Sequence, residues 1–179
     1  VVSLHATKIL AAGEGGVVLS RDTALVRSIA ARANFGFVGE RRADVAGFNG
    51  KLSEYGAAVA LASLDRWPET RAAYVELTQN YCGAFSAADG LAFSPGFGDD
   101  WVSSTCNISF DGPLASDAMA RLREAGIDSR QWWGKGCHLE RAFEDFPRTE
   151  LRVTDDLGHR VVGLPFHPEL GSAEIHRIA

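Results

Sequence analysis

Hydrophobic and polar residues alternate strictly along residues 105–110, with an apolar side chain at each even-numbered position. Alternation of this kind predicts a strand that is buried on one face. Two shorter runs near the start, residues 1–4 and 16–20, are apolar and β-branched and also favour strands. The first of these runs is typical of the end of a buried strand. Between them lies Gly-Glu-Gly-Gly at positions 13–16, which is too rich in glycine for a regular element and predicts a turn.

Helical segments are marked by residues that cap or start helices. Asp22 precedes residues 23–33, and Ser53 precedes an alanine-rich segment; both residue types accept hydrogen bonds from the first N–H groups of a helix. Similar signals predict further helices over about residues 68–81, 117–125 and 173–179. Strands and helices therefore alternate, which predicts a mixed α/β protein.

One long segment fits neither a helix nor a strand. Residues 34–50 hold four glycines together with many polar side chains. We expect a long irregular loop here, and loops of this length in compact domains often carry function.

Composition narrows the classes of protein that fit. The chain has 179 residues, which suits one large domain or one domain with an appendage. Its apolar share of 46% and charged share of 23% are typical of a packed protein. The net charge of −5 disfavours nonspecific nucleic-acid binding, and no apolar run has the length of a bilayer span or a signal peptide. We therefore expect a cytoplasmic protein that binds neither nucleic acid nor a membrane.

Cysteine and histidine positions argue against a metal site or a disulfide framework. The three cysteines are widely spaced without a CxxC pair, and the histidines lack metal-ligand spacing. Cys137 and His138 are neighbours, and a catalytic pair is normally distant in sequence, so we interpret them as packing or loop residues. Trp132 and Trp133 belong to a core or line a ligand cleft, and the core is the commoner role of aromatic pairs.

Lys8 is the candidate for covalent chemistry. A lone lysine is usually a solvated surface charge, but Lys8 lies between a strand-like apolar run and the glycine-rich turn. At the end of a buried strand, low-dielectric surroundings would lower the pKa of its ammonium group. The unprotonated amine attacks aldehydes, and pyridoxal phosphate is the biological aldehyde that uses this reaction. The residues alone leave open a small α/β binding domain in which Lys8 is a surface residue.

Four segments together resemble one enzyme family. Residues 3–16, "SLHATKILAAGEGG", match the pattern S-[FL]-H-x-x-K followed by G-E-G-G in register. Three later segments also fit: "GFNGKLSEYGAAVALASLDR" at 47–66, "LREAGIDSRQWWGKGCH" at 122–138 and "LPFHPEL" at 164–170. The chain thereby resembles the DegT/DnrJ/EryC1/StrS family of pyridoxal-phosphate-dependent sugar aminotransferases over nearly its whole length.

The resemblance implies a fold and a division into domains. The fold would be α/β, the fold type I of pyridoxal-phosphate transferases, which is aspartate aminotransferase-like. Residues 1–66 would form the C-terminal part of the large cofactor-binding domain, and residues 67–179 a small α+β C-terminal domain. Because family chains are longer, the chain resembles the C-terminal half of such an enzyme. The acid that pairs with the pyridine nitrogen and the ring-stacking aromatic would then precede residue 1.

The resemblance also implies roles for three residues. Lys8 would form the internal aldimine with pyridoxal 5'-phosphate and then shuttle a proton as general base and acid. Ser3 would hydrogen-bond the cofactor phosphate. Asn49 would reach the phosphate held by the partner subunit, so the active site would be shared in a homodimer. His5 and Lys51 also fall within the matching segments, without an assigned role.

The implied activity is the transfer of an amino group from an amino acid, glutamate in most of the family, to a nucleotide-linked keto-deoxysugar. Some members carry histidine at the position of Lys8 and perform dehydration, so the lysine favours transamination. The alternative is a catalytically incomplete fragment, or a non-catalytic interaction module of the same fold.

Overall fold

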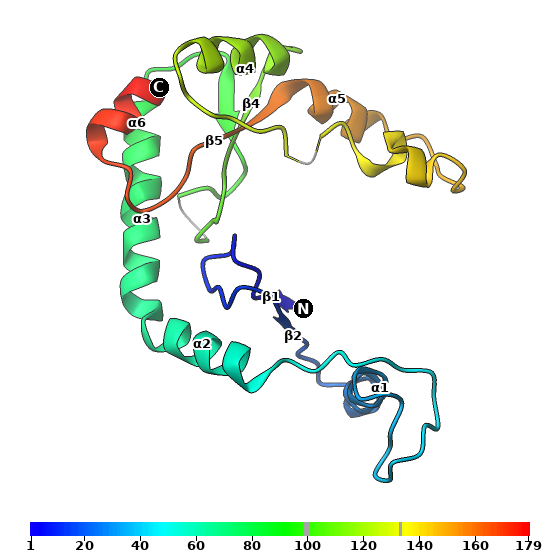
Figure 1. Ribbon diagram of the computed structural model, residues 1–179. Helices are drawn as coiled ribbons and strands as arrows, with labels where there is room; N and C mark the ends of the chain where they lie inside the picture. Colours follow the sequence, from blue (N-terminus) through cyan, green and yellow to red (C-terminus); the bar gives the residue numbers. More distant parts are fainter. Residues whose placement is uncertain (99–100, 133) are drawn as a thin grey trace. The chain divides into compact units, whose positions relative to one another are not determined.

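The computed structural model describes residues 1–98, 101–132 and 134–179. Trp133, the second member of the tryptophan pair considered above, lies outside the described residues. The chain forms two compact units, Val1–Thr70 and Arg71–Ala179 (Figure 1). The assignment of residues 1–66 and 67–179 to a large and a small domain stays a prediction.

The first unit contains a two-stranded sheet and two helices. Strand β1 (Val2–Ser3) pairs antiparallel with β2 (Gly16–Val17). Helices α1 (Thr23–Ala33) and α2 (Glu54–Asp65) begin where the sequence predicts. Asp22 accepts hydrogen bonds from two N–H groups of α1, and Ser53 accepts one from Gly56 in α2. Both predicted caps are confirmed.

The predicted buried strand at the start of the chain is wrong in one respect. Both residues of β1 are exposed, and so are both residues of β2. Only the following residue, Leu4, is buried, at 3% exposure. A pair of two-residue strands is too small to bury side chains by itself. Its apolar content therefore did not show whether another part of the protein covers it.

The segment 34–50 is irregular, as predicted, but it folds back onto the end of α1. Phe48 N–H donates to the carbonyl of Arg32 at 2.8 Å, and Gly50 N–H donates to that of Ala33 at 2.8 Å. Phe35 N–H in turn donates to the carbonyl of Phe48 at 3.0 Å. These bonds satisfy carbonyl groups that a helix end leaves open, and they fix both ends of the loop at one place.

The second unit is built on an antiparallel sheet of three strands in the order β3-β4-β5. Its strands are β3 (Leu91–Phe93), β4 (Cys106–Phe110) and β5 (Val161–Leu164). Most of α3 (Trp67–Ala84) belongs to this unit. The other helical elements are α4 (Ala115–Glu124), η1 (Cys137–Leu139), η2 (Arg141–Phe143), α5 (Arg152–Arg160) and α6 (Ser172–Ile178).

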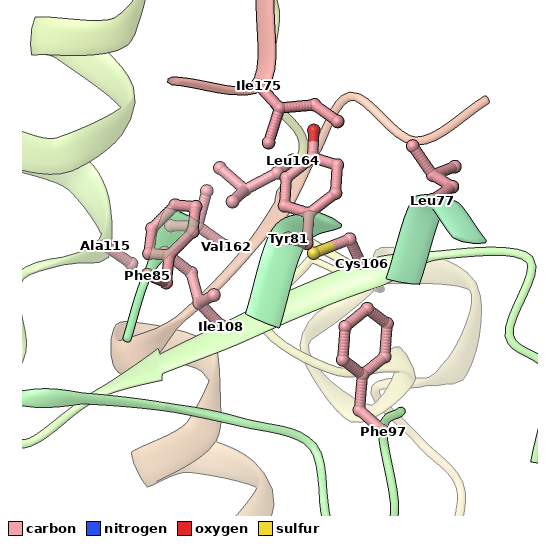
Figure 2. Close-up of a cluster of buried hydrophobic side chains, with 10 residues drawn as sticks. All are labelled: Leu77, Tyr81, Phe85, Phe97, Cys106, Ile108, Ala115, Val162, Leu164 and Ile175. Carbon is pink, nitrogen blue, oxygen red and sulfur yellow. The ribbon is translucent and has the colours of Figure 1, made fainter. Parts of the chain in front are cut away.

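The core of the second unit joins α3, the sheet and α6 (Figure 2). Cys106 and Ile108 of β4 are buried, as the alternating pattern predicts. Tyr81 of α3 is fully buried, and its hydroxyl donates to the carbonyl of Pro165. Burial raises the pKa of the Tyr81 hydroxyl and that of the Cys106 thiol. Both groups are therefore held in their neutral forms in the folded protein.

Several elements of the second unit were not predicted, and one predicted helix begins earlier than expected. Strands β3 and β5, helix α5 and the short helices η1 and η2 have no counterpart among the elements expected from the sequence. Helix α4 begins at Ala115, before the predicted start at about residue 117, and its preceding residue makes no capping hydrogen bond through its side chain. Among the helices of the described residues, none is long and apolar enough to cross a membrane.

Candidate functional site

Lys8 lies in a closed loop at the end of the β1–β2 pair. Beyond the two strands, Leu4 N–H donates to the Gly15 carbonyl at 3.0 Å and Ala6 N–H donates to the Gly13 carbonyl at 2.7 Å. The hydrogen bonding of a hairpin thus continues past its strands. Residues 5–14 are held as one compact loop, and Lys8 is half-buried within it.

Two backbone hydrogen bonds tie Ser3 and Lys8 to the same residue. The N–H of His5 donates to Ser3 Oγ at 3.3 Å, and the N–H of Lys8 donates to the carbonyl oxygen of His5 at 2.9 Å. The first bond uses a lone pair of Ser3 Oγ, so the hydroxyl hydrogen can be donated to an anion. The Ser3 hydroxyl at the end of β1 and the backbone of Lys8 are therefore both held by His5.

Backbone conformation explains why the turn at residues 13–16 is rich in glycine. Gly13 and Gly15 have φ values of +85° and +136°, which side-chain-bearing residues rarely adopt. A Cβ atom on Gly15 would also lie 2.8 Å from Leu52 Cδ1. The loop consequently lies so close to the segment before α2 that a side chain at position 15 would displace the end of Leu52.

Helix α2 also contacts the other side of the loop. Ser63 Oγ donates to the carbonyl oxygen of Ala11 at 2.7 Å. The loop is therefore fixed by β1 and β2 at its base and by α2 at its side. Because β1 is exposed, the first unit does not supply the low-dielectric surroundings that a buried strand would have given Lys8.

Asn49 lies in the other loop of the first unit, 34–50. It forms an isolated antiparallel bridge with Asn34 and is exposed. Lys51, two residues later, donates through Nζ to Asn34 Oδ1 at 3.1 Å and lies 4.3 Å from the centre of the Phe35 ring. The structure thus places Ser3 at the end of β1, Lys8 in the loop that follows it, and Asn49 in a second loop. The contacts of Asn34 and Phe35 with Lys51 were not visible in the sequence.

His138 of the Cys137–His138 pair has a partner elsewhere in the chain. His138 Nε2 lies 2.7 Å from Asp155 Oδ1 of α5, and the histidine side chain is only 11% exposed. Cys137 is exposed. His138 therefore connects η1 to α5, in line with a packing role, and its partner was missed because α5 was not predicted.

Two cavities of the second unit are lined by residues of the segments considered above or by its helices. Arg130 lies over the ring of Trp132 at 5.8 Å, beside a cavity of about 190 Å³ that both residues line. Another cavity of about 440 Å³ lies under α4 and α6. Within residues 1–98, 101–132 and 134–179, no group of three or more His, Cys, Asp or Glu side chains is arranged to hold a metal ion.

Comparison with known proteins decides the family. The whole of residues 1–179 matches the model of the DegT/DnrJ/EryC1/StrS aminotransferase family. The chain belongs to this family. The resemblance inferred from the four segments is thereby confirmed, and so is the expected fold of pyridoxal-phosphate-dependent aminotransferases.

Individual relatives agree with this assignment. Protein Rv3402c of Mycobacterium tuberculosis is 34% identical over 99% of this chain and 44% of its own length. The UDP-N-acetyl-3-dehydro-alpha-D-glucosamine 3-aminotransferase of Acidithiobacillus ferrooxidans is 28% identical over 94% of this chain and 45% of its own. The solved structure of DesI with its TDP-sugar product is 29% identical, with a TM-score of 0.86 over 98% of this chain and 46% of that chain. The chain thus spans less than half the length of these relatives.

Proposed function

We propose that this chain is part of a pyridoxal-phosphate-dependent aminotransferase that acts on a nucleotide-linked keto-deoxysugar. The amino group would come from an amino acid, with glutamate as the donor. The family assignment and the two sugar-related proteins above support the proposal. The observation that carries it is the loop in which His5 joins Ser3 and Lys8 through backbone hydrogen bonds.

The residues of this loop fit the proposed cofactor, because an amine and a hydroxyl donor are what an aldehyde with a phosphate group requires. Lys8 would hold the cofactor through its ε-amino nitrogen, and Ser3 would donate its hydroxyl hydrogen to the phosphate. When bound, the cofactor supplies an electron sink that makes the proton on the substrate's amino-bearing carbon removable. Lys8 would take up that proton and return it, as general base and then general acid.

Asn49 supports a shared site in a homodimer. It lies outside the Lys8 loop, on an exposed segment whose path is fixed by the bonds of residues 34–50 to α1. Its amide group has donors suited to a phosphate. We propose that Asn49 reaches the cofactor phosphate in the partner subunit, so that each active site uses residues of both chains.

A second candidate is a catalytically incomplete fragment or a non-catalytic module of the same fold. One observation favours it: apolar side chains of the first unit are exposed to solvent. They include Leu61 and Leu64 of α2, at 61% and 52% exposure. Apolar surface of this kind is usually covered by another part of the protein or by a partner.

The experiment that tests the proposal is a single-turnover assay with L-glutamate. The complete protein that carries this chain is loaded with pyridoxal phosphate and mixed with L-glutamate, and release of 2-oxoglutarate is measured. We expect Lys8→Ala to slow release by about 10²–10⁴-fold, the usual contribution of a general acid–base, whereas Lys135→Ala on an exposed loop retains the rate.

The outcomes separate the two candidates. Release by the complete protein and none by residues 1–179 alone would identify the chain as an incomplete fragment of an active enzyme. No release by the complete protein with any amino acid donor would favour the non-catalytic module. Equal rates for the native protein and Lys8→Ala would remove Lys8 from its proposed role.

A further inference from the structure

His5 begins the Lys8 loop, residues 5–14, and its ring lies near residues on both sides of that loop. Its Nδ1 accepts a hydrogen bond from the backbone N–H of Thr7 at 3.1 Å and lies 2.9 Å from Thr7 Oγ1. Its Nε2 lies 3.6 Å from Oε1 of Glu14, which is on the opposite side of the loop. The ring therefore spans the loop that displays Lys8.

The contact with Thr7 determines the tautomer of His5. A backbone N–H is always a donor, so the Nδ1 that faces it is the accepting nitrogen of the ring. The ring hydrogen is then on Nε2, where it points toward the carboxylate of Glu14. A neighbouring group thus sets which nitrogen carries the proton, as is usual for histidines with a defined role.

Glu14 is the single residue with a side chain in the run from Gly13 to Gly16. The positive φ values of Gly13 and Gly15 set the turn on either side of it. The hydrogen bond from Ala6 N–H to the Gly13 carbonyl holds that turn against the His5 side of the loop. The glycines thus shape a turn that presents one carboxylate to the histidine ring.

We infer that His5 and Glu14 are positioning residues for Lys8. The backbone of His5 is bonded to Ser3 and Lys8, its ring accepts from Thr7, and the Glu14 carboxylate lies 3.6 Å from the ring on the other side of the loop. The inference rests on the proposed function in that Lys8 is taken as the residue that carries the cofactor. The two side chains are 46% and 86% exposed, so solvent screens their attraction and their effect is on geometry more than on stability.

Three substitutions of His5 distinguish its contact with Thr7 from its contact with Glu14. His5→Asn places an amide oxygen near the position of Nδ1, and asparagine commonly accepts from the N–H two residues on. His5→Gln extends an amide toward Glu14 instead. His5→Ala removes both contacts. Glu14→Gln keeps the size of the Glu14 side chain and removes its charge.

The first measurement needs no cofactor. In the complete protein, 15N NMR of the His5 ring should show a protonated Nε2 and an unprotonated Nδ1. Amide hydrogen exchange at Thr7 should be about tenfold faster in His5→Ala, a change that corresponds to the loss of one ordinary hydrogen bond. His5→Asn should restore slow exchange at Thr7, and His5→Gln should not. A protonated Nδ1, or equal exchange in all variants, would overturn the inference.

The second measurement connects the loop to Lys8. The complete protein is incubated with limiting pyridoxal phosphate and reduced with borohydride, and the modified fraction of Lys8 is quantified by mass spectrometry. We expect about a tenfold lower fraction in His5→Ala, recovery in His5→Asn, and an intermediate loss in Glu14→Gln. Unchanged modification of Lys8 in His5→Ala and Glu14→Gln would overturn the positioning role and leave the proposed function intact. Modification absent from Lys8 in the native protein would overturn the proposed function itself.

Discussion

Ser63 Oγ donates a hydrogen bond to the carbonyl oxygen of Ala11 at 2.7 Å, which joins helix α2 to the loop that carries Lys8. The two residues are far apart in sequence and their contact is side chain to backbone. The position of Lys8 therefore depends on α2 as well as on the β1–β2 pair.

Removal of this hydrogen bond should loosen the loop without unfolding α2. We predict that Ser63→Ala lowers the free energy of local opening around residues 8–12 by about 1 kcal/mol, the usual net value of one hydrogen bond. Amide hydrogen exchange at Ala12 is the measurement. Ser28→Ala, on the exposed surface of α1, serves as the control and should leave that exchange rate unchanged. Equal exchange in the two variants would show that Ser63 does not hold the loop.

In the turn at residues 13–16, substitution by alanine should cost less stability at Gly13 than at Gly15. Gly13 and Gly15 both have positive φ, but only at Gly15 would a Cβ meet Leu52, at 2.8 Å. We predict that Gly13→Ala costs about 1 kcal/mol from backbone strain and Gly15→Ala about 2–3 kcal/mol from strain and crowding together. Urea unfolding of each variant gives these values.

A third variant isolates the crowding. Adding Leu52→Ala to Gly15→Ala should recover part of the loss, because the side chain that meets the new Cβ is gone. Identical costs for the two single glycine variants, or a purely additive double variant, would contradict the contact between Gly15 and Leu52.

The buried core of the second unit predicts how stability changes at alkaline pH. Burial raises the pKa of Tyr81 and of Cys106 above their ordinary values. The folded protein therefore keeps both protons at a pH where the unfolded chain has released them. The contribution to stability is complete below the unfolded-state values, about 8.5 for cysteine and about 10 for tyrosine, and is lost as the pH rises above them.

The measurement is the free energy of unfolding in urea between pH 8 and pH 11. We predict a decrease that approaches about 1.4 kcal/mol per pH unit for each group once its unfolded-state pKa is passed. Tyr81→Phe should be less stable at pH 8, because the Pro165 carbonyl loses its donor, but should show a shallower decrease above pH 10. The same slope in Tyr81→Phe and the native protein would contradict a neutral, buried Tyr81.

Two neighbouring aspartates of α5 should differ in importance. Asp155 accepts from the nearly buried His138 ring, whereas Asp156 pairs with Arg160, whose guanidinium also donates to the Phe110 carbonyl. Loss of its partner is costly for a buried polar group and costs little where the group keeps a second hydrogen bond. We predict that Asp155→Ala costs about 1–3 kcal/mol of unfolding free energy and Asp156→Ala about 0–0.5 kcal/mol. Similar costs, measured by urea unfolding, would show that the His138–Asp155 contact does not hold α5.

The sequence predicted elements whose signals are local. The caps at Asp22 and Ser53 and the alternation in residues 105–110 depend only on near neighbours, and the structure confirms all three. Elements held by distant contacts were missed. Helix α5 is fixed by His138 and by the bond from Gln131 to Gly158, and the three residues of β3 are too few for a periodic pattern.

The candidate site likewise has parts that the sequence predicted and parts that it did not. The motif placed Ser3 and Lys8 in one segment because both precede the same glycine turn, and the structure shows the hydrogen bonds that join them. The ring contacts of His5 with Thr7 and Glu14 depend on the three-dimensional path of the loop, which spacing does not specify. Asn49 was proposed from resemblance alone, and its approach to a partner subunit stays a prediction.

The most direct test of the account is the identity of the lysine that carries the cofactor. The chain contains three lysines, Lys8, Lys51 and Lys135, so peptide mapping distinguishes them without ambiguity. The complete protein is loaded with saturating pyridoxal phosphate, reduced with borohydride, digested and mapped by mass spectrometry. We expect one modified residue of this chain, Lys8, and no modification in Lys8→Arg. Modification at Lys51 or Lys135 in place of Lys8, or none in the chain, would contradict it.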